Sequence, residues 1–423
     1  MPDNELSKLP QTFRAFSHRN YRLYFFGQGL SLVGTWVQRT ALIWLVYRLS
    51  GSAQILGTID FAGQISGLVL IPFAGAMLDR YSRYRTVVVA QALSMLQALT
   101  LAALVLSGQV LIWQLALLNI VLGVINSFDM PARQSFISEI VDEERDLPNA
   151  IALNSAMFNS ARIIGPSVAG VAIGFFGEGV CFLLNGISYG AVLVSLLMMR
   201  LPVREARPVQ RENILEGIWD GMRYSYQSLP IRTSLLLLIF SSLTCMPVLV
   251  LLPVFVGEVL GGGPTILGGL MTCFGVGALL GTLALASRSG IRGLERVIFG
   301  AAGVGGTALV LFTFVRSLYI ALPLAVIIGF GMIAQMAATN TALQTLVDES
   351  KRGRVMSLYT LTFGGFGPIG SLLTGSLAAA VGAPRAFLLT SLIYLAGVAV
   401  FARFLSRWRL AAEKIYRAKG MLE

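Results

Sequence analysis

The chain has 423 residues, of which 55% are hydrophobic and only 13% are charged, and its mean hydropathy is +0.74. In soluble proteins roughly a quarter of all residues are charged, so this composition excludes an ordinary soluble domain. The net charge of +11 does not indicate nucleic-acid binding, because the basic residues are spread over many short segments and form no single basic patch.

The amino-terminal tail, residues 1–20, is polar and lacks the apolar core and cleavage site of a signal peptide, so we expect the first apolar segment to be retained. His18 in this tail is the only histidine, which excludes histidine-based metal sites and Ser-His-Asp catalysis within the apolar segments. The three cysteines lie in apolar segments and are interpreted as small buried residues. The sequence therefore predicts no metal site, no catalytic site and no enzyme activity.

Twelve apolar segments follow this tail, each long enough to cross a bilayer. A transmembrane helix needs about 20 mostly apolar residues to span roughly 30 Å of hydrocarbon. We predict such helices near residues 21–47, 54–78, 86–107, 110–130, 151–176, 179–199, 232–257, 265–287, 296–315, 318–345, 355–381 and 384–405.

Basic residues gather in every second gap between these spans. Of the 32 Lys and Arg residues, 27 lie in the two tails, in the gaps after spans 2, 4, 6, 8 and 10, or within three residues of the span ends that border them, whereas Arg48, Arg316 and Arg385 lie in the other gaps. Arg39 and Arg162 lie inside spans. The positive-inside rule then places both termini in the cytoplasm of a multi-pass protein, which we expect in a bacterial inner membrane.

Three charged residues inside the spans are candidates for proton coupling, since a charge near the bilayer centre costs at least ~2.5 kcal/mol. Arg39 in span 1 and Asp60 in span 2 lie roughly 10 to 12 Å below the outer surface, so they can pair, either for coupling or as a structural bridge. Arg162 lies near the middle of span 5. It is a second coupling candidate, and it could instead hold an anionic substrate group, Asp60, Asp129 or helix carbonyls.

Polar and aromatic residues within the spans predict an amphipathic cavity that accepts a small organic molecule. Any one amide alone more often joins helices than binds a ligand. The candidate cavity residues are Trp36, Phe61, Gln64, Asn126, Asn154, Asn159, Asn185, Gln335 and Asn340.

The gap after span 2 reads Gly75-Ala-Met-Leu-Asp-Arg-Tyr-Ser-Arg-Tyr-Arg85. This stretch resembles the signature of the major facilitator superfamily, with Ser82 where that family usually has Gly. The resemblance implies a cytoplasmic gate in which Asp79 and Arg83 tie two helical bundles together; the alternative is a turn whose arginines only set the topology. The residues assigned to the gate are Gly75, Asp79, Arg80, Arg83, Asp129 and Arg133.

Further strings in spans 1 to 5, such as Trp36-Val-Gln-Arg39 and Met130-Pro-Ala-Arg133, resemble the branch of this superfamily that contains the bacterial enterobactin exporter. The stretch from Gly165 through Pro166 to Gly170 also resembles the Gly-Pro motif of drug and proton antiporters. Proline removes a helix hydrogen bond and glycine allows close packing, so we expect span 5 to bend there, or to carry a packing kink without a role in transport. Asn119 stands where such antiporters have a buried arginine.

The two halves of the chain repeat one another. Residues 141–143 after span 4 read Val-Asp-Glu, as do residues 347–349 after span 10. At an offset of 205 residues, a second correspondence joins Gly170, Gly177 and Phe182 to Gly375, Gly382 and Phe387. A parallel duplication of six spans is typical of transporters that work by alternating access.

The predicted fold is therefore an all-α polytopic membrane protein of twelve transmembrane helices in two six-helix bundles, as the resemblance also implies. The predicted parts are a cytoplasmic tail (1–20), a first bundle (21–200), a linker with an amphipathic helix on the membrane surface (201–231), a second bundle (232–405) and a basic cytoplasmic tail (406–423).

The predicted function is secondary active export of a small organic molecule, siderophore-like or drug-like, by proton antiport. A metabolite importer or uniporter of the same fold is the main alternative, and a membrane-embedded enzyme or a non-transporting sensor is a further one. The chain has no nucleotide-binding Gly-x4-Gly-Lys-Ser/Thr motif, so we expect no cofactor and only a proton gradient as energy source. The expected partners are the substrate and the lipid bilayer, with no nucleic acid, and the expected oligomeric state is a monomer.

Overall fold

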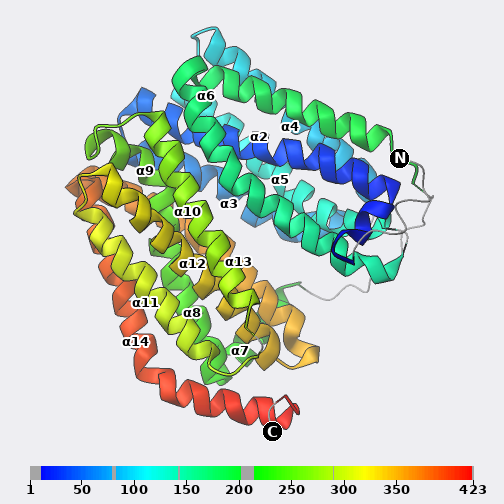
Figure 1. The fold of residues 1–423 in the computed structure, drawn as a ribbon, viewed down its shortest axis with the longest axis vertical. Helices are drawn as coiled ribbons and strands as arrows, with labels where there is room; N and C mark the ends of the chain where they lie inside the picture. The colour runs from blue at the N-terminus through cyan, green and yellow to red at the C-terminus, as the bar shows by residue number, and fades with distance from the viewer. Residues whose placement is uncertain (1–10, 79–81, 142, 202–213, 289, 422–423) are drawn as a thin grey trace. The chain divides into compact units, whose positions relative to one another are not determined.

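The computed structural model describes residues 11–78, 82–141, 143–201, 214–288 and 290–421, and within these ranges it contains helices and no strand (Figure 1). The elements are η1 (Gln11–Ser17), α2 (Arg19–Ser50), α3 (Ala53–Leu78), α4 (Arg83–Leu106), α5 (Ile112–Ile140), η2 (Glu144–Asp146), α6 (Leu147–Leu197), α7 (Ile214–Gln227), α8 (Leu229–Thr244), α9 (Met246–Glu258), α10 (Pro264–Ala286), α11 (Leu294–Thr313), α12 (Leu318–Leu346), α13 (Glu349–Val381) and α14 (Ala383–Ala418).

The chain forms two compact units. The first comprises residues 1–49 and 62–210, and the second comprises residues 50–61 and 211–423. The first turns of α3 therefore group with the second unit, whereas the rest of this helix belongs to the first.

Nine helical stretches within the described ranges are long and apolar enough to cross a membrane. One of them, residues 144–197, holds two of the predicted spans, and another, residues 229–258, combines α8 and α9 into one. With α2 and α3 added, these stretches account for the twelve predicted spans, so the prediction of an all-α polytopic membrane protein is confirmed.

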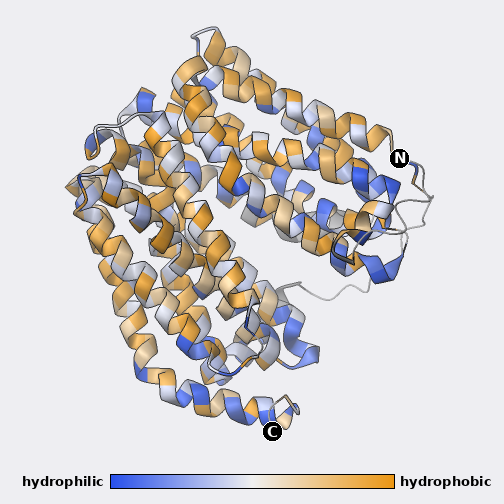
Figure 2. Ribbon diagram, in the orientation of Figure 1, coloured by the Kyte–Doolittle hydropathy of each residue, from blue (hydrophilic) through white to orange (hydrophobic). Residues whose placement is uncertain are grey.

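The surface of these helices is suited to lipid. Figure 2 shows hydrophobic residues along most of their length and hydrophilic residues gathered near helix ends, for example around α7. Phe175 is 80% exposed and Phe176 67% exposed. Such exposure of large apolar side chains is unfavourable in water and ordinary in hydrocarbon.

Two glycines at equivalent places separate the last two spans of each half. Gly177 has φ 78 and ψ 173, and Gly382, 205 residues later, has φ 85 and ψ 152. Only glycine adopts such positive φ values without steric cost. Phe182 and Phe387, five residues after each glycine, are both fully buried. The duplication read from the sequence is therefore also present in the backbone.

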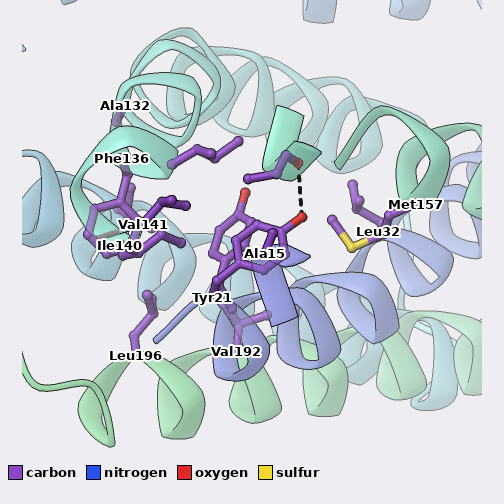
Figure 3. Close-up of a cluster of buried hydrophobic side chains, with 14 of the residues drawn as sticks. Ala15, Tyr21, Leu32, Ala132, Phe136, Ile140, Val141, Met157, Val192 and Leu196 are labelled. Carbon is purple, nitrogen blue, oxygen red and sulfur yellow. Dashed lines mark hydrogen bonds between the residues drawn. The ribbon is translucent and has the colours of Figure 1, made fainter. Parts of the chain in front are cut away.

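An aromatic and aliphatic cluster forms one part of the core of the first unit (Figure 3). Tyr21 of α2 lies in it with no exposed surface, and its hydroxyl donates a hydrogen bond to the Ala150 carbonyl of α6 at 2.9 Å. Phe136 of α5 and Leu196 of α6 complete the contact between these helices. A buried phenol needs such a partner, since an unsatisfied hydroxyl in the core is costly.

In the second unit, glycines bring α10 and α12 into backbone contact. A Cβ atom added at Gly277 would lie 1.9 Å from the Val326 carbonyl oxygen, and one added at Gly329 would lie 2.1 Å from the Phe274 carbonyl oxygen. Helices in membranes associate by this close packing of small residues. Gly277 and Gly329 therefore serve to pack α10 against α12.

The helix α7 of the linker docks on the second unit. Its Asp220 carboxylate pairs with Lys351 Nζ at 2.7 Å and with the Arg354 guanidinium, and its Tyr224 hydroxyl donates to Asp348 Oδ2 at 3.0 Å. Trp219 on the same helix remains largely exposed. One side of α7 thus binds the first turns of α13, and the other side presents an aromatic side chain.

We expect Asp220→Asn to loosen α7. Hydrogen bonds from Lys351 and Arg354 hold the pKa of Asp220 below its ordinary value. The carboxylate therefore stabilises the docking of α7 at neutral pH. This stabilisation is lost only when the pH falls below the ordinary pKa of an aspartate and the carboxylate takes up a proton. Hydrogen exchange of the α7 amides should therefore speed up in the variant at pH 7, and in the wild type only at low pH. Glu349→Gln is the control, because it removes a more exposed acid at the start of α13 and should leave the exchange of the α7 amides unchanged. If Asp220→Asn and the wild type exchange equally fast, the contacts of Asp220 with Lys351 and Arg354 do not hold α7.

Candidate transport site

A seam between α2 and α6 brings three of the predicted residues together in the first unit, Trp36, Arg39 and Gly165. The Trp36 ring packs edge-on against Phe158, with ring centroids 6.1 Å apart. A Cβ atom added at Gly165 would lie 2.3 Å from Trp36 Cβ, so glycine is what allows α6 to approach Trp36. The guanidinium carbon of Arg39 lies 5.5 Å from the centre of the Trp36 ring, a distance at which a cation interacts with the indole face.

Arg162 projects from the same face of α6 as Phe158 and Gly165, because residues three and four apart are neighbours on a helix. It lies 15 residues after Leu147, the first residue of α6, and 15 before Gly177, where the helix is interrupted. At 1.5 Å per residue it is about 22 Å from either point, which places it mid-span as predicted. Its Nε is buried and has no hydrogen-bond partner within the described ranges.

The helix-bend motif lies inside α6. Pro166 stands within the helix, and the departure from helical dihedrals in α6 falls at Gly177. Gly165 contributes close packing against Trp36, and Gly170 is buried. The close packing expected at Gly165 is therefore present, and a bend of span 5 at Pro166 stays a prediction.

Asp129 and Arg133, assigned to the cytoplasmic gate, form a buried ion pair within α5. Arg133 Nε lies 2.7 Å from Asp129 Oδ2, although its N–H is not aligned for a hydrogen bond, and the two side chains are only 19% and 4% exposed. Gln91 of α4 donates to the other carboxylate oxygen at 2.9 Å. The pair thus holds α4 against α5 inside the first unit.

The other gate residues are only partly described. Asp79 and Arg80 lie outside the described residues, and Gly75 belongs to the last turn of α3. Arg83 NH1 lies 3.0 Å from Glu139 Oε1 of α5, with both side chains partly exposed. Arg83 therefore ties the start of α4 to the end of α5, and its predicted role between the bundles stays a prediction.

A chain of amide side chains crosses the first unit. Asn185 of α6, a predicted cavity residue, is fully buried and donates to Gln38 Oε1 at 2.8 Å. Gln38 of α2 donates to Gln97 Oε1 at 3.0 Å, and Gln97 of α4 donates to the Leu118 carbonyl of α5 at 3.2 Å. The structure thus uses Asn185 to join four helices, the alternative that was left open for each buried amide.

The remaining cavity candidates of the first unit differ in exposure. Gln64 of α3 and Asn126 of α5 are exposed in the middle of apolar helices. Asn154 accepts a hydrogen bond from the Tyr24 hydroxyl at 3.5 Å, and Asn159 donates to the Ser155 carbonyl of its own helix at 2.8 Å. An exposed amide inside a span is expected to face a polar cavity and not lipid, which favours Gln64 and Asn126.

Four predicted residues group with the second unit. Asp60 and Phe61 are half-buried in the first turns of α3. Gln335 of α12 is fully buried, and neither its side-chain oxygen nor its nitrogen has a hydrogen-bond partner within the described ranges. Asn340 accepts from Gln344 one turn further along the same helix.

The sequence reasoning missed several paired polar residues. Arg48 forms two contacts with Glu178, at 2.8 and 3.2 Å, next to the interruption at Gly177. His18, placed in a polar tail, is buried and lies 3.1 Å from Asp146 Oδ2. The sequence signal that could have indicated such pairs is a long polar side chain inside an apolar helix, such as Gln91, which donates to Asp129.

Two units of apolar helices, with charged and polar groups held at mid-span, define a polytopic membrane transporter of the major facilitator type. The chain belongs to the transmembrane secretion effector family, whose model matches residues 11–418. The membership of the major facilitator superfamily that the sequence motifs predicted is thereby confirmed.

Known relatives cover nearly the whole chain. It is 29% identical over 398 residues to the multidrug efflux pump Tap of Mycolicibacterium fortuitum, covering 92% of this chain and 95% of that protein. It is 26% identical over 371 residues to the staphyloferrin A transporter of Staphylococcus aureus, covering 86% and 91%.

Solved structures show the same fold at low sequence identity. A POT family transporter in complex with 5-aminolevulinic acid has a TM-score of 0.74 at 12% identity, covering 95% of this chain and 99% of that one. A bacterial homolog of the human lysosomal transporter Spinster has a TM-score of 0.72 at 15% identity, covering 93% and 98%.

Proposed function

We propose that this protein exports a small organic molecule from the cytoplasm, driven by inward flow of protons. The observation that carries the proposal is the set of charged side chains held inside the spans, with Arg39 and Arg162 on one seam of the first unit. Charges in hydrocarbon are costly and mark the path of a substrate or a proton. A relative named as a multidrug efflux pump supports the direction of transport, and the staphyloferrin A transporter supports an organic substrate.

The setting proposed for this activity is the bacterial inner membrane, with both termini in the cytoplasm. The support is the distribution of 27 basic residues over the tails and alternate loops. We propose a monomer that works without a cofactor, a nucleic-acid partner or an enzymatic step, so that the proton gradient is its only energy source.

We expect the compounds accumulated by cells to reveal both substrate and direction. Cells with and without the protein are compared by mass spectrometry of extract and medium, in the presence and absence of a protonophore. At least one organic compound should be depleted inside and enriched outside when the protein is present, and the protonophore should remove the difference. Enrichment inside the cells would instead support the importer, and an export that resists the protonophore would contradict proton coupling.

The orientation has its own test. Cysteines introduced at Ser52 and Ala383, in a chain without Cys181, Cys245 and Cys273, should react with an impermeant thiol reagent added outside, and a cysteine at Gln210 should not. The opposite labelling pattern would reverse the assignment of the termini.

A further inference from the structure

Two arginines inside the spans of the first unit belong to none of the ion pairs found among its described residues. Those pairs join Arg48 to Glu178, Arg83 to Glu139, Arg133 to Asp129, Arg145 to Glu143 and His18 to Asp146. Within the described ranges, no acid of this unit therefore neutralises the charge of Arg39 or of Arg162. Since both lie within spans, their charge needs a counterpart that the unit itself does not supply.

The same two arginines flank one aromatic surface. Arg39 lies over the Trp36 ring, and Trp36 contacts Phe158 and the backbone at Gly165. Arg162 lies one helical turn from both Phe158 and Gly165 on α6, so helix spacing places it on the side of α6 where these two residues meet Trp36. Phe158 and Arg39 are exposed, and Trp36 and Arg162 are half-buried, so the cluster is open on one side.

The position along the helices places this opening deep in the membrane. Arg162 is at the middle of its span, and Arg39 lies 11 residues before Ser50, the last residue of α2, or about 16 Å along the axis. An exposed guanidinium at this depth is expected to face a polar cavity, because facing lipid would leave it without hydrogen-bond partners.

We propose that Trp36, Arg39, Phe158 and Arg162 form the subsite for an organic anion with a planar unsaturated body. This inference rests on the proposed export function and specifies the substrate class of that site. The guanidinium groups bind a carboxylate or a similar oxyanion through charge-assisted hydrogen bonds, for which their planar donor pattern is suited. The two rings provide the apolar surface against which a planar body stacks.

A cationic substrate does not fit this cluster. The two guanidinium groups repel positive charge, and the described acids of the unit are already engaged with other cations or lie near the helix ends. Because the cavity is surrounded by protein and hydrocarbon of low dielectric constant, this repulsion is stronger than in bulk water and is screened less by salt. The charge balance of the seam therefore selects for the sign of the substrate, and the rings select for its shape.

The test compares two dyes that share the planar xanthene ring and differ in charge, carboxyfluorescein (anionic) and rhodamine 123 (cationic). Binding to the purified full-length protein in detergent is measured by fluorescence anisotropy. The wild type should bind carboxyfluorescein at least about tenfold more tightly than rhodamine 123. Arg162→Gln and, separately, Arg39→Gln should each weaken carboxyfluorescein binding by about tenfold and leave rhodamine 123 binding unchanged.

Three further variants separate the subsite from a general loss of folding. Arg162→Lys keeps the charge and should recover part of the affinity, Trp36→Leu should weaken the binding of both dyes, and Arg403→Gln on the exposed surface of α14 should change neither. A wild type that binds neither dye, or that prefers rhodamine 123, would overturn the proposal. The proposal would also be overturned if the Arg162→Gln variant stays monodisperse but its binding of both dyes is weakened equally.

Equilibrium binding needs no proton gradient, so this test is independent of the one for export. A preference for the anionic dye together with absent efflux would keep the subsite and reject the exporter. Efflux without that preference would keep the exporter and reject the subsite.

Discussion

Replacing Asp129 by asparagine is expected to destabilise the protein by about 3 to 5 kcal/mol, the usual cost of removing one partner of a buried ion pair. The carboxylate is 4% exposed and lies 2.7 Å from Arg133 Nε, so its loss leaves a guanidinium charge in the interior of the first unit. It also removes a charged acceptor from the Gln91 amide of α4, which weakens the contact between α4 and α5. Loss of the monodisperse protein on heating in detergent measures the effect.

The same helix provides a matched control. Glu139 of α5 also pairs with an arginine, Arg83 at 3.0 Å, but the two side chains are 26% and 41% exposed. Glu139→Gln should therefore cost less than about 1 kcal/mol, because solvent screens an exposed pair.

A double variant separates the cost of the unpaired charge from the value of the pair. Asp129→Leu combined with Arg133→Met removes both charges and should be more stable than either single variant. If Asp129→Asn and Glu139→Gln lose their monodisperse state at the same temperature, the buried pair of Asp129 and Arg133 does not stabilise this unit.

Much of the fold could be predicted from the sequence, because a bilayer allows few solutions. Apolar segments of about 20 residues must be helices when no water is present to satisfy the backbone. The interruption near Gly177 was placed within a residue or two, since glycine is what a positive φ requires and the same residue recurs at Gly382.

The site could be predicted only in part, because helix periodicity does not fix which face of a span is turned toward which neighbour. Trp36 and Gly165 were both selected from the sequence, but their contact depends on how closely α2 approaches α6. Asn185 was selected by the same criterion, and it is buried and donates to Gln38, which in turn donates to Gln97. A buried amide has the same sequence signature whether it binds a ligand or another amide.

Tertiary pairing of charges was the least predictable feature. His18 lies in a stretch that reads as a polar tail, yet it is buried against Asp146, 128 residues away in sequence. Arg48 and Glu178 are likewise 130 residues apart. No local pattern encodes such distant pairs, so only the packing of the helices shows them.

Asp60→Asn is expected to abolish uphill, proton-driven export in proteoliposomes and to leave downhill exchange of the substrate measurable. Asp60 lies seven residues after Ala53, the first residue of α3, or about 10 Å into the helix, where it is half-buried. The charge of a carboxyl group in such surroundings depends on whether a guanidinium is near, so a change in that distance during the transport cycle makes it take up a proton on one side and release it on the other. Asparagine keeps the shape and a hydrogen-bonding side chain but carries no titratable proton, and it should therefore separate coupling from substrate movement.

Thr58→Val is the matched control, because the Thr58 hydroxyl donates to the Gln54 carbonyl of its own helix and removing it should affect neither uphill export nor downhill exchange. Uphill export that persists in Asp60→Asn would reject Asp60 as the coupling group. A loss of both uphill export and downhill exchange would support a structural bridge at this position.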